Sequence, residues 1–427
     1  MAQLFTWGYN GNGELGNSSF DDASSPIQIG SETNWKFVSS GYYNIYGIKN
    51  DGSMWGWGQD RDGSVGDLSG NDASSPVQIG QGKKWVKISS SDYDYPSVAA
   101  ITSDGALYMW ARNWDGNLGL GDTDDRSSPT QVGSSSDWSD VGTSYLFTAA
   151  VKKNGTLWTW GDNYWGQLGH GDTSNTSSPN QVGSATTWKR VDCGAEHTIA
   201  IKTNGTLWSW GYNYGGELGL GDENLYSEPQ QVGSDTTWSK LSVGRNHAGA
   251  IKTDGTLWMW GDNGNGELGV GDYDDRSSPT QVGSGTNWVE VSCGYYTTLA
   301  RKSDGSTWAW GYNNDGQLGV GDTDDRSFPA QVGSDTTWSM VSTGYYSSAA
   351  LKGSISEPVV PTIVTCAQAA CAGKSTGFSC VKDSLCTCAQ MKIFYPQCTR
   401  AQIASGTCYG NRGAYVAAIT VCNQRLF

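Results

Sequence analysis

The stretch "TLWTWGDNYWGQLGHGD", residues 156–172, places two tryptophans two positions apart and follows them with four glycines. Nearly the same letters return as "TLWSWGYNYGGELGLGD" at 206–222 and as "TLWMWGDNGNGELGVGD" at 256–272. Aromatic residues and glycines at fixed positions are typical of short strands joined by tight turns, not of helices. The repetition raises the question of whether the pattern serves chemistry or holds a scaffold together.

The repeat has a nearly constant period. Its "WG" dipeptide, which is "WA" in one copy, recurs every 50 residues apart from one step of 53. The long step contains "SSSDYDYPSVAAI", residues 89–101, which carries three more residues than its siblings. Seven copies at a period of this length predict a solenoid or a propeller. The tryptophans of the dipeptide are Trp7, Trp57, Trp110, Trp160, Trp210, Trp260 and Trp310.

Each unit reads as four strands. In the unit that starts at residue 188, "WKRVDCG" alternates and ends at glycine, "HTIAIK" is small and apolar, and the following "TNG" is a hairpin signal before "TLWSW". Both tryptophans of "TLWSW" fall on one face, because successive side chains of a strand point to opposite faces. After the glycine-rich loop, "EPQQV" forms a short fourth strand whose proline suits a sheet edge. Four antiparallel strands without a helical pattern describe a propeller blade.

The two ends of the repeat region complete one blade. The first repeat begins at its third strand, "LFTWG" at 4–8, and the last repeat stops after its second strand, "SSAALK" at 347–352. Joined together, these pieces make a full blade in which the N-terminal strand closes the ring and removes the sheet edges at the seam. We therefore predict an all-β protein with a seven-bladed β-propeller over residues 1–352.

Composition changes abruptly near "GSISEPVVPT", residues 353–362. All 21 tryptophans lie before this segment and eight of the ten cysteines lie after it. We interpret 353–363 as a linker and 364–427 as a small disulfide-rich domain, since a short module with four disulfides is typical of extracellular proteins. The domain has no histidine and no C-x-x-C pair, which disfavours zinc, and its disulfide connectivity stays open. Its cysteines are Cys366, Cys371, Cys380, Cys386, Cys388, Cys398, Cys408 and Cys422.

The repeat resembles a known family. The phrase W-G-x-N-x-x-G-[EQ]-L-G-x-G-D, followed by S-x-P-x-Q-V and H-x-x-A-[IL]-K-x-[DN]-G, is similar to the regulator of chromosome condensation repeat over residues 1–352. The resemblance implies a seven-bladed β-propeller but no single function. Eukaryotic relatives include a nucleotide exchange factor for the small GTPase Ran, and bacterial relatives include secreted inhibitors of β-lactamase. The regular spacing is similar to that of microbial or viral members.

The cysteine-rich segment carries a second, fainter resemblance. "CVKDSLCTC" at 380–388 resembles the core of fungal CFEM domains, which also contain eight cysteines. In some of those domains the aspartate that matches Asp383 contacts haem iron. The outer cysteine spacings of residues 364–427 depart from the CFEM pattern, and we predict that the chain holds no cofactor.

The charge is unevenly divided along the chain. The formal net charge is −15, which separates into +5 from residue 364 onward and −20 before it. An acidic chain without a basic patch is not expected to bind nucleic acid. The longest apolar runs are too short for membrane insertion. Because "MAQLFTWG" enters the repeat pattern at once, no secretory signal is visible.

The sequence offers little support for catalysis, and we predict that the protein is not an enzyme. His197 and His247 occupy equivalent positions in their repeats and are interpreted as residues that bond within their own blade; the third histidine is His170. No Ser-His-Asp or Cys-His pairing has a persuasive local context. Cys193 and Cys293 are also equivalent and are interpreted as buried free thiols of the first strand.

Acidic loops such as "GDTDDRSSP" at 121–129 have two interpretations. Spaced carboxylates such as Asp122, Asp124 and Asp125 resemble Ca²⁺ ligands, but the EF-hand spacing and its distal glutamate are missing. The alternative is an aspartate-capped turn in which Arg126, or its counterparts Arg276 and Arg326, pairs with local acids. We favour the turn and predict no metal site.

One face of the propeller is the predicted binding surface. The loops between first and second strands and between third and fourth strands share a face, and both kinds carry aromatic residues. Exposed tyrosine and tryptophan suit protein or glycan contacts, since they offer large area at little entropic cost. The alternative is that most of these rings fold back onto the loops. The candidates are Tyr42, Tyr43, Tyr93, Tyr95, Trp114, Tyr164, Trp165, Tyr214, Tyr295, Tyr296, Tyr345 and Tyr346.

These observations favour a non-enzymatic protein that binds or assembles outside the cell, or on the surface of a cell or virion, with a role such as adhesion. The alternatives are an intracellular regulatory propeller of the exchange-factor kind and a secreted enzyme inhibitor. The basic cysteine-rich tail is predicted to act as an assembly element that docks on the propeller of the same or the next molecule. The second arrangement would build a homo-oligomer or a filament.

Overall fold

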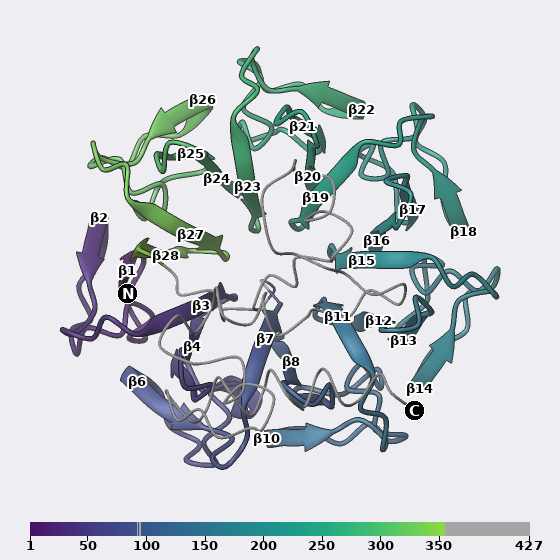
Figure 1. Cartoon of the computed structure of the whole chain (residues 1–427), viewed down its shortest axis with the longest axis horizontal. Coiled ribbons are helices and arrows are strands. Elements are labelled where there is room, and N and C mark those ends of the chain that lie inside the picture. The colour runs from purple at the N-terminus through teal and green to yellow at the C-terminus, as the bar shows by residue number, and fades with distance from the viewer. Residues whose placement is uncertain (92, 94, 355–427) are drawn as a thin grey trace, which may run out of the picture. The chain divides into compact units, whose positions relative to one another are not determined.

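The computed structural model describes residues 1–91, 93 and 95–354. Over these residues the chain forms a ring of seven blades, each of four antiparallel strands (Figure 1). Five blades are separate sheets, and the other two are joined into one eight-stranded sheet by the pairing of Ala2 with Trp35. The predicted seven-bladed β-propeller is therefore confirmed. Within the described part of the chain the one helical element is the 3-10 turn η1 (Arg61–Gly63), and no helix is long and apolar enough to cross a membrane.

The first two strands of each blade form its inner half. Every first strand begins at a tryptophan, and these strands line the centre of the ring (Figure 1). The first strands are β3 (Trp35–Ser40), β7 (Trp85–Ser90), β11 (Trp138–Thr143), β15 (Trp188–Cys193), β19 (Trp238–Val243), β23 (Trp288–Cys293) and β27 (Trp338–Thr343). The second strands are β4 (Asn44–Lys49), β8 (Ser97–Thr102), β12 (Phe147–Lys152), β16 (His197–Lys202), β20 (His247–Lys252), β24 (Thr297–Lys302) and β28 (Ser347–Gly353).

The third and fourth strands form the outer half. The third strands are β5 (Met54–Gly58), β9 (Leu107–Ala111), β13 (Leu157–Gly161), β17 (Leu207–Gly211), β21 (Leu257–Gly261), β25 (Thr307–Gly311) and β1 (Ala2–Gly8). The fourth strands are β6 (Ala73–Ile79), β10 (Arg126–Gln131), β14 (Thr176–Gln181), β18 (Tyr226–Gln231), β22 (Arg276–Gln281), β26 (Arg326–Gln331) and β2 (Ala23–Gln28). We number the blades from β3–β6, blade 1, to β23–β26, blade 6.

Blade 7 is assembled from both ends of the repeat region. Strand β1 pairs with β28 in continuous antiparallel register from Ala2 opposite Gly353 to Gly8 opposite Ser347, and β2 pairs with β1. The amino group of Met1 also donates to the carbonyl of Ser354 at 2.5 Å. The predicted closure by the N-terminal strand is confirmed, and the seam has the same strand order as the other blades.

The hydrophobic core lies between neighbouring blades. At the junction of blades 3 and 4, Trp188 and Trp210 pack with Leu157, Val151 and other side chains of blade 3. Trp208 lies against the same cluster, so both tryptophans of the third strand share one face, as the alternation predicts. Each interface buries large aromatic surface, and this is where most of the hydrophobic stabilisation arises.

Candidate functional site

The predicted binding surface consists of two kinds of loop on each blade. Because the four strands are antiparallel, the loop from first to second strand and the loop from third to fourth strand emerge at the same end of the blade. We call this end of the propeller the glycine-loop face. Its long loops cover residues 9–22, 59–72, 112–125, 162–175, 212–225, 262–275 and 312–325.

Each long loop is bound to the next blade by one indole hydrogen bond. The Nε1 of the repeat tryptophan donates to a backbone carbonyl in the glycine-rich loop of the preceding blade, at 2.7–2.9 Å in all seven cases. These bonds answer the question raised by the repeated pattern, because the tryptophans join blades. The pairs are Trp57–Glu14, Trp110–Ser64, Trp160–Asn117, Trp210–Gln167, Trp260–Glu217, Trp310–Glu267 and Trp7–Gln317.

The glycine after the loop leucine is required by the same contact. Gly169 has φ +77°, and a Cβ atom built there would lie 2.7 Å from Nε1 of Trp210. No other residue fits both the left-handed backbone and the indole that covers it. The tryptophan and glycine pattern at 156–172 is therefore scaffolding for the face, and any binding function has to come from the residues between.

The acidic loops are closed turns. Arg126 pairs with Asp122 at 2.6 Å, and Asp125 accepts a hydrogen bond from the backbone N–H of Asn113. Equivalent pairs join Arg276 to Asp272 and Arg326 to Asp322. This arrangement is the predicted aspartate-capped turn, and among the described residues no group of acidic, cysteine or histidine side chains is arranged to hold a metal ion.

Seven of the twelve candidate aromatic residues form one cluster around the centre of the face. Tyr345 lies 4.0 Å from Tyr295 and 4.8 Å from Tyr42, measured between ring centroids. Most of these rings are half-buried by one another, and Tyr295 is buried. The cluster consists of Tyr42, Tyr43, Tyr93, Tyr295, Tyr296, Tyr345 and Tyr346.

Tyr93 reaches this cluster from the far side of the ring. It belongs to the three-residue insertion of blade 2, yet its ring stacks on Tyr145 of blade 3 at 3.9 Å and lies 5.4 Å from Tyr295 of blade 6. Arg245 of blade 5 lies among the same rings, with Cζ 4.4 Å from the centroid of Tyr295. The ring of Tyr93 therefore joins contacts from blades 3 and 6 on the glycine-loop face.

Three of the other candidates form an exposed group farther out on blades 3 and 4. Tyr164 is 69% exposed and Tyr214 is 56% exposed, whereas Trp165 between them is half-buried. The ring of Trp165 lies 4.8 Å from Tyr164 and 5.9 Å from Tyr214. Tyr212, which was not among the candidates, contacts both Trp165 and Tyr214. The two exposed rings thus contact half-buried aromatic neighbours.

The last two candidates hold an arginine between them. Arg112 lies with Cζ 3.5 Å from the ring centroid of Tyr95 and 3.3 Å from that of Trp114. The guanidinium is buried, and its Nε and Nη1 atoms have no hydrogen-bond partner among the described residues. Trp114 covers it with one face and is 61% exposed on the whole. Blade 2 therefore presents a third exposed aromatic residue.

The sequence prediction missed several residues of the face. Tyr145 occupies the loop position of Tyr345, and an alignment of the repeats would have found it. Tyr9, Tyr212 and Tyr312 directly follow the repeat glycine and contact the candidate rings. No sequence pattern predicts the position of Arg112, because it depends on the rings of Tyr95 and Trp114, which lie on either side of it.

His197 and His247 do not form the predicted hydrogen bonds within their own blades. His247 Nε2 lies 3.0 Å from Thr298 Oγ1 of the next blade, so that interpretation was wrong for this residue. Neither ring nitrogen of His197 has a hydrogen-bond partner among the described residues. Burial lowers the pKa of His197 to about 3 and that of His247 to about 4. His170, by contrast, lies 3.0 Å from Thr159 of its own blade.

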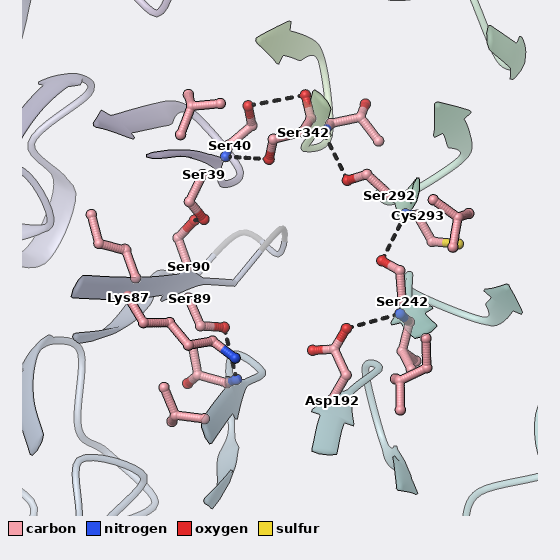
Figure 2. A pocket seen from close by; sticks show the side chains of 18 of the residues that line it. Ser39, Ser40, Lys87, Ser89, Ser90, Asp192, Ser242, Ser292, Cys293 and Ser342 are labelled. Atoms are coloured by element: carbon pink, nitrogen blue, oxygen red, sulfur yellow. Dashed lines mark hydrogen bonds between the residues drawn. The ribbon is translucent and has the colours of Figure 1, made fainter. Parts of the chain in front are cut away.

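The centre of the ring contains a polar cavity of about 230 Å³ lined by the first strands (Figure 2). Serine hydroxyls there accept hydrogen bonds from the backbone of the following blade, as Ser342 Oγ does from the N–H of Ser40 at 2.9 Å. The same bond recurs at Ser89, Ser242 and Ser292. The hydroxyls therefore link the first strands of neighbouring blades.

Two aspartates of the cavity are also engaged in hydrogen bonds. Asp140 pairs with Lys87 and accepts the N–H of Val191. Asp192 takes the place of a serine and accepts the N–H of Val243 at 3.0 Å, and burial raises its pKa to about 6. Cys193 and Cys293 are both buried, as predicted, and no disulfide joins them. Burial raises the pKa of Cys193, which is opposite to the shift that a nucleophilic thiolate requires.

Comparison with known families agrees with this architecture. A model of the RCC1-like domain matches residues 2–289, and models of the regulator of chromosome condensation (RCC1) repeat match residues 288–317 and 304–351. The fold and its inter-blade bonds define a propeller of this class, and the chain belongs to the RCC1-like domain family. A sequence search of curated proteins finds no match.

Solved structures show the same fold. Yeast RCC1 (Prp20), in its crystal structure with Kap60, is 20% identical, with a TM-score of 0.74 over 83% of this chain and 90% of that chain. Prp20p from Saccharomyces cerevisiae in another crystal structure is 21% identical, with a TM-score of 0.73 over 83% and 92%. Human WBSCR16 is 18% identical, with a TM-score of 0.74 over 83% and 99%.

Proposed function

We propose that this chain is a non-enzymatic binding protein whose glycine-loop face engages a protein partner. The observation that carries the proposal is the exposure of Trp114, Tyr164 and Tyr214 on three consecutive blades. Large aromatic rings left in solvent on one face of a scaffold are typical of interaction sites. Contacts with neighbouring side chains already restrict these rings, so binding would cost them little conformational entropy.

The titratable groups support a binding role over catalysis. Both buried histidines have pKa values far below neutrality, so neither is tuned for general acid–base chemistry near pH 7. The serines of the cavity link neighbouring blades and have no histidine beside them among the cavity-lining residues. These features support the prediction that the protein is not an enzyme.

The structural relatives support a protein as the partner. Yeast RCC1 was crystallised with Kap60, and Prp20p was studied for its binding to Gsp1p and histones. This likeness favours the alternative of an intracellular regulatory propeller over extracellular assembly. It gives no support to a glycan partner or a homo-oligomer.

The predicted location outside the cell and the assembly role of the tail depend on Cys366–Cys422, which lie outside the described residues. The linker beyond Ser354, the cysteine-rich domain and the CFEM resemblance lie there too, and all of them stay predictions. Gly353, predicted as the first linker residue, belongs instead to β28. The secreted enzyme inhibitor also stays an untested alternative.

Recovery of binding partners, followed by affinity measurement, tests the proposed function. The full chain and a variant with Trp114→Ala, Tyr164→Ala and Tyr214→Ala would be used to recover partners from the material in which the protein is made. The recovered protein would then be identified, purified and titrated. We expect the triple variant to lose at least about tenfold in affinity, since aromatic residues of this kind dominate interface energetics. Tyr273→Thr is the control, because Tyr273 is 55% exposed on the same face in blade 5.

The regulatory alternative has its own test. If the chain acts like an exchange factor, catalytic amounts of it should accelerate the release of labelled GDP from the small GTPase Ran. If GDP release is not accelerated but the triple variant loses its partner, the chain is a binding protein without exchange activity. Acceleration that the triple variant retains would place the function elsewhere on the propeller.

A further inference from the structure

The charges of the propeller are sorted between its two ends. The loops of the glycine-loop face are rich in aspartate and glutamate, and the described part of the chain places no lysine in them and only three arginines, Arg61, Arg112 and Arg245. The lysines lie instead in first strands, near the ends of second strands or in the opposite loops. They are Lys36, Lys49, Lys83, Lys84, Lys87, Lys152, Lys153, Lys189, Lys202, Lys240, Lys252, Lys302 and Lys352. The exposed aromatic rings therefore stand on an anionic surface.

On blades 3 and 4, which carry Tyr164 and Tyr214, no arginine offsets the charge of the loop aspartate. On blades 2, 5 and 6 an arginine at the start of the fourth strand pairs with the loop aspartate. On blade 3 that position is Thr176, and Asp172 makes no ion pair with a described residue. On blade 4 it is Tyr226, whose hydroxyl contacts Asp222 at 3.0 Å without cancelling its charge. The charges of Asp172 and Asp222 are thus not neutralised by a described cation, although both carboxylates accept hydrogen bonds from their own blade.

Two more carboxylates lie close to the same rings. Asp115 follows Trp114, and Asp162 accepts the backbone N–H of Tyr164. Neither makes an ion pair with a described residue. Burial, and then the charge of Asp162, raise the pKa of Asp115, whereas the charge of Arg112 lowers it.

The face already holds cations with its aromatic rings. Arg112 is sandwiched between Tyr95 and Trp114. The ring of Tyr95 also contacts Arg61, whose Cζ lies 4.9 Å from its centroid. Arg245 is held among the central tyrosines in the same manner. A guanidinium over an aromatic face is attracted by the ring quadrupole. The remaining exposed faces of Trp114, Tyr164 and Tyr214 offer the same interaction to a partner, with carboxylates beside them.

We propose that the aromatic arc formed by Trp114, Tyr164, Trp165 and Tyr214 binds an arginine- or lysine-rich segment of a partner protein. The proposal rests on the proposed function and names the partner's chemistry. Carboxylates steer the basic segment toward the face, and the exposed rings stack on its cationic groups. An acidic or purely apolar segment lacks this complementarity, since like charges would oppose its approach.

A peptide titration tests the partner chemistry. The full chain would be titrated against a fluorescein-labelled 12-residue peptide of alternating arginine and glycine, with a glutamate–glycine peptide of equal length as comparison. We expect anisotropy to report binding of the arginine peptide alone, and raising the salt from about 0.05 M to about 0.5 M to weaken it at least about tenfold, because the shorter Debye length screens exposed charges. Equal binding of both peptides, or none, would overturn the proposal.

Matched variants locate the site. Trp114→Ala, Tyr164→Ala and Tyr214→Ala together should weaken the arginine peptide at least about tenfold, whereas Tyr273→Thr should leave it unchanged. Asp172→Asn should weaken binding more than Asp272→Asn, because Arg276 already pairs with Asp272. Both substitutions remove one negative charge and keep an oxygen for the neighbouring asparagine. Equal effects of the two aspartate variants, or an unaffected triple variant, would place the basic segment away from the arc.

Failure of this inference and failure of the proposed function look different. If the natural partner is lost by the triple variant but the arginine peptide never binds, the face is a binding site of other chemistry and the inference is wrong. If the peptide depends on the arc while the natural partner does not, the arc has the inferred chemistry and the proposed function is wrong. Thermal melting of each variant, monitored by circular dichroism, shows whether it is folded.

Discussion

The indole Nε1 of Trp7 donates a hydrogen bond to the backbone carbonyl of Gln317 at 2.9 Å, across 310 positions of sequence. At the blade junctions within the repeat region, the same bond joins residues 43 to 46 positions apart. The seam of the propeller is therefore closed by the bond that joins every other pair of neighbouring blades. Strand β1 supplies both the indole and the main-chain ladder to β28, so closure depends on the first eight residues.

Trp7→Phe should destabilise the propeller by opening this junction. The substitution removes the N–H donor of a fully buried ring and leaves part of its volume empty. We expect the free energy of unfolding to fall by roughly 2–4 kcal/mol, from the lost hydrogen bond and the cavity together. Urea unfolding measures it. Trp114→Phe is the control, since Trp114 is exposed, and equal effects of the two substitutions would contradict the importance of the seam.

Gly319→Ala should cost more stability than Gly333→Ala. Both glycines have similar left-handed backbones, with φ +69° and φ +60°. A Cβ at Gly319 would lie 2.6 Å from Nε1 of Trp7, whereas nothing lies within 4 Å of a Cβ at Gly333. The control should therefore report backbone strain alone, about 1–2 kcal/mol. Unfolding by guanidinium should show a further loss of at least about 1 kcal/mol for Gly319→Ala, from overpacking against the indole.

The architecture was predictable because its determinants recur along the chain. The 50-residue period, the alternation in "TLWSW" and the incomplete repeats at the two ends specified blade number, strand order and closure. Each blade buries its tryptophans against its neighbour, so sequence repetition translates directly into structural repetition. The same logic identified the capped turns, because Arg126 and Asp122 recur at equal spacing in three loops.

The location of the candidate site was predictable, but the division of its aromatic rings into packed and exposed ones was not. Periodicity placed the aromatic residues on one face, yet which rings remain exposed depends on contacts that no repeat shares. Tyr93 lies in the insertion, whose length does not say that it reaches Tyr295 on the other side of the ring. Arg112 replaces uncharged or acidic residues of its siblings and becomes buried because two rings enclose it. Side-chain packing between loops decided these outcomes.

The central tyrosines should behave as scaffold in a stability measurement. Tyr345 and Tyr346 are half-buried and contact rings from blades 1, 6 and 7. We expect Tyr345→Ala with Tyr346→Ala to lower the free energy of unfolding by roughly 2–4 kcal/mol, from lost apolar burial and aromatic pairs. Tyr164→Ala, at a ring that is 69% exposed, should change it by less than about 1 kcal/mol. Similar melting temperatures for the two variants would show that the central rings are not structural.

Glu217→Gln should stabilise the propeller in a pH-dependent manner. The carboxyl of Glu217 is buried, and desolvation raises its pKa from 4.5 to about 7. Between these values the folded state binds more protons than the unfolded state, so the stability contributed by this group is present below pH 4.5 and is lost as the pH rises through 7. Glutamine does not titrate, and its oxygen can accept the N–H of Gly215 as Gln167 accepts that of Trp165. Above pH 7 we expect a gain on the order of 1–3 kcal/mol, fading to near zero at pH 4.5. Chemical unfolding of Glu217→Gln and of the exposed control Glu223→Gln, at pH 4.5 and pH 8, measures the difference. A gain that is the same at both pH values would show that Glu217 is not the titrating group.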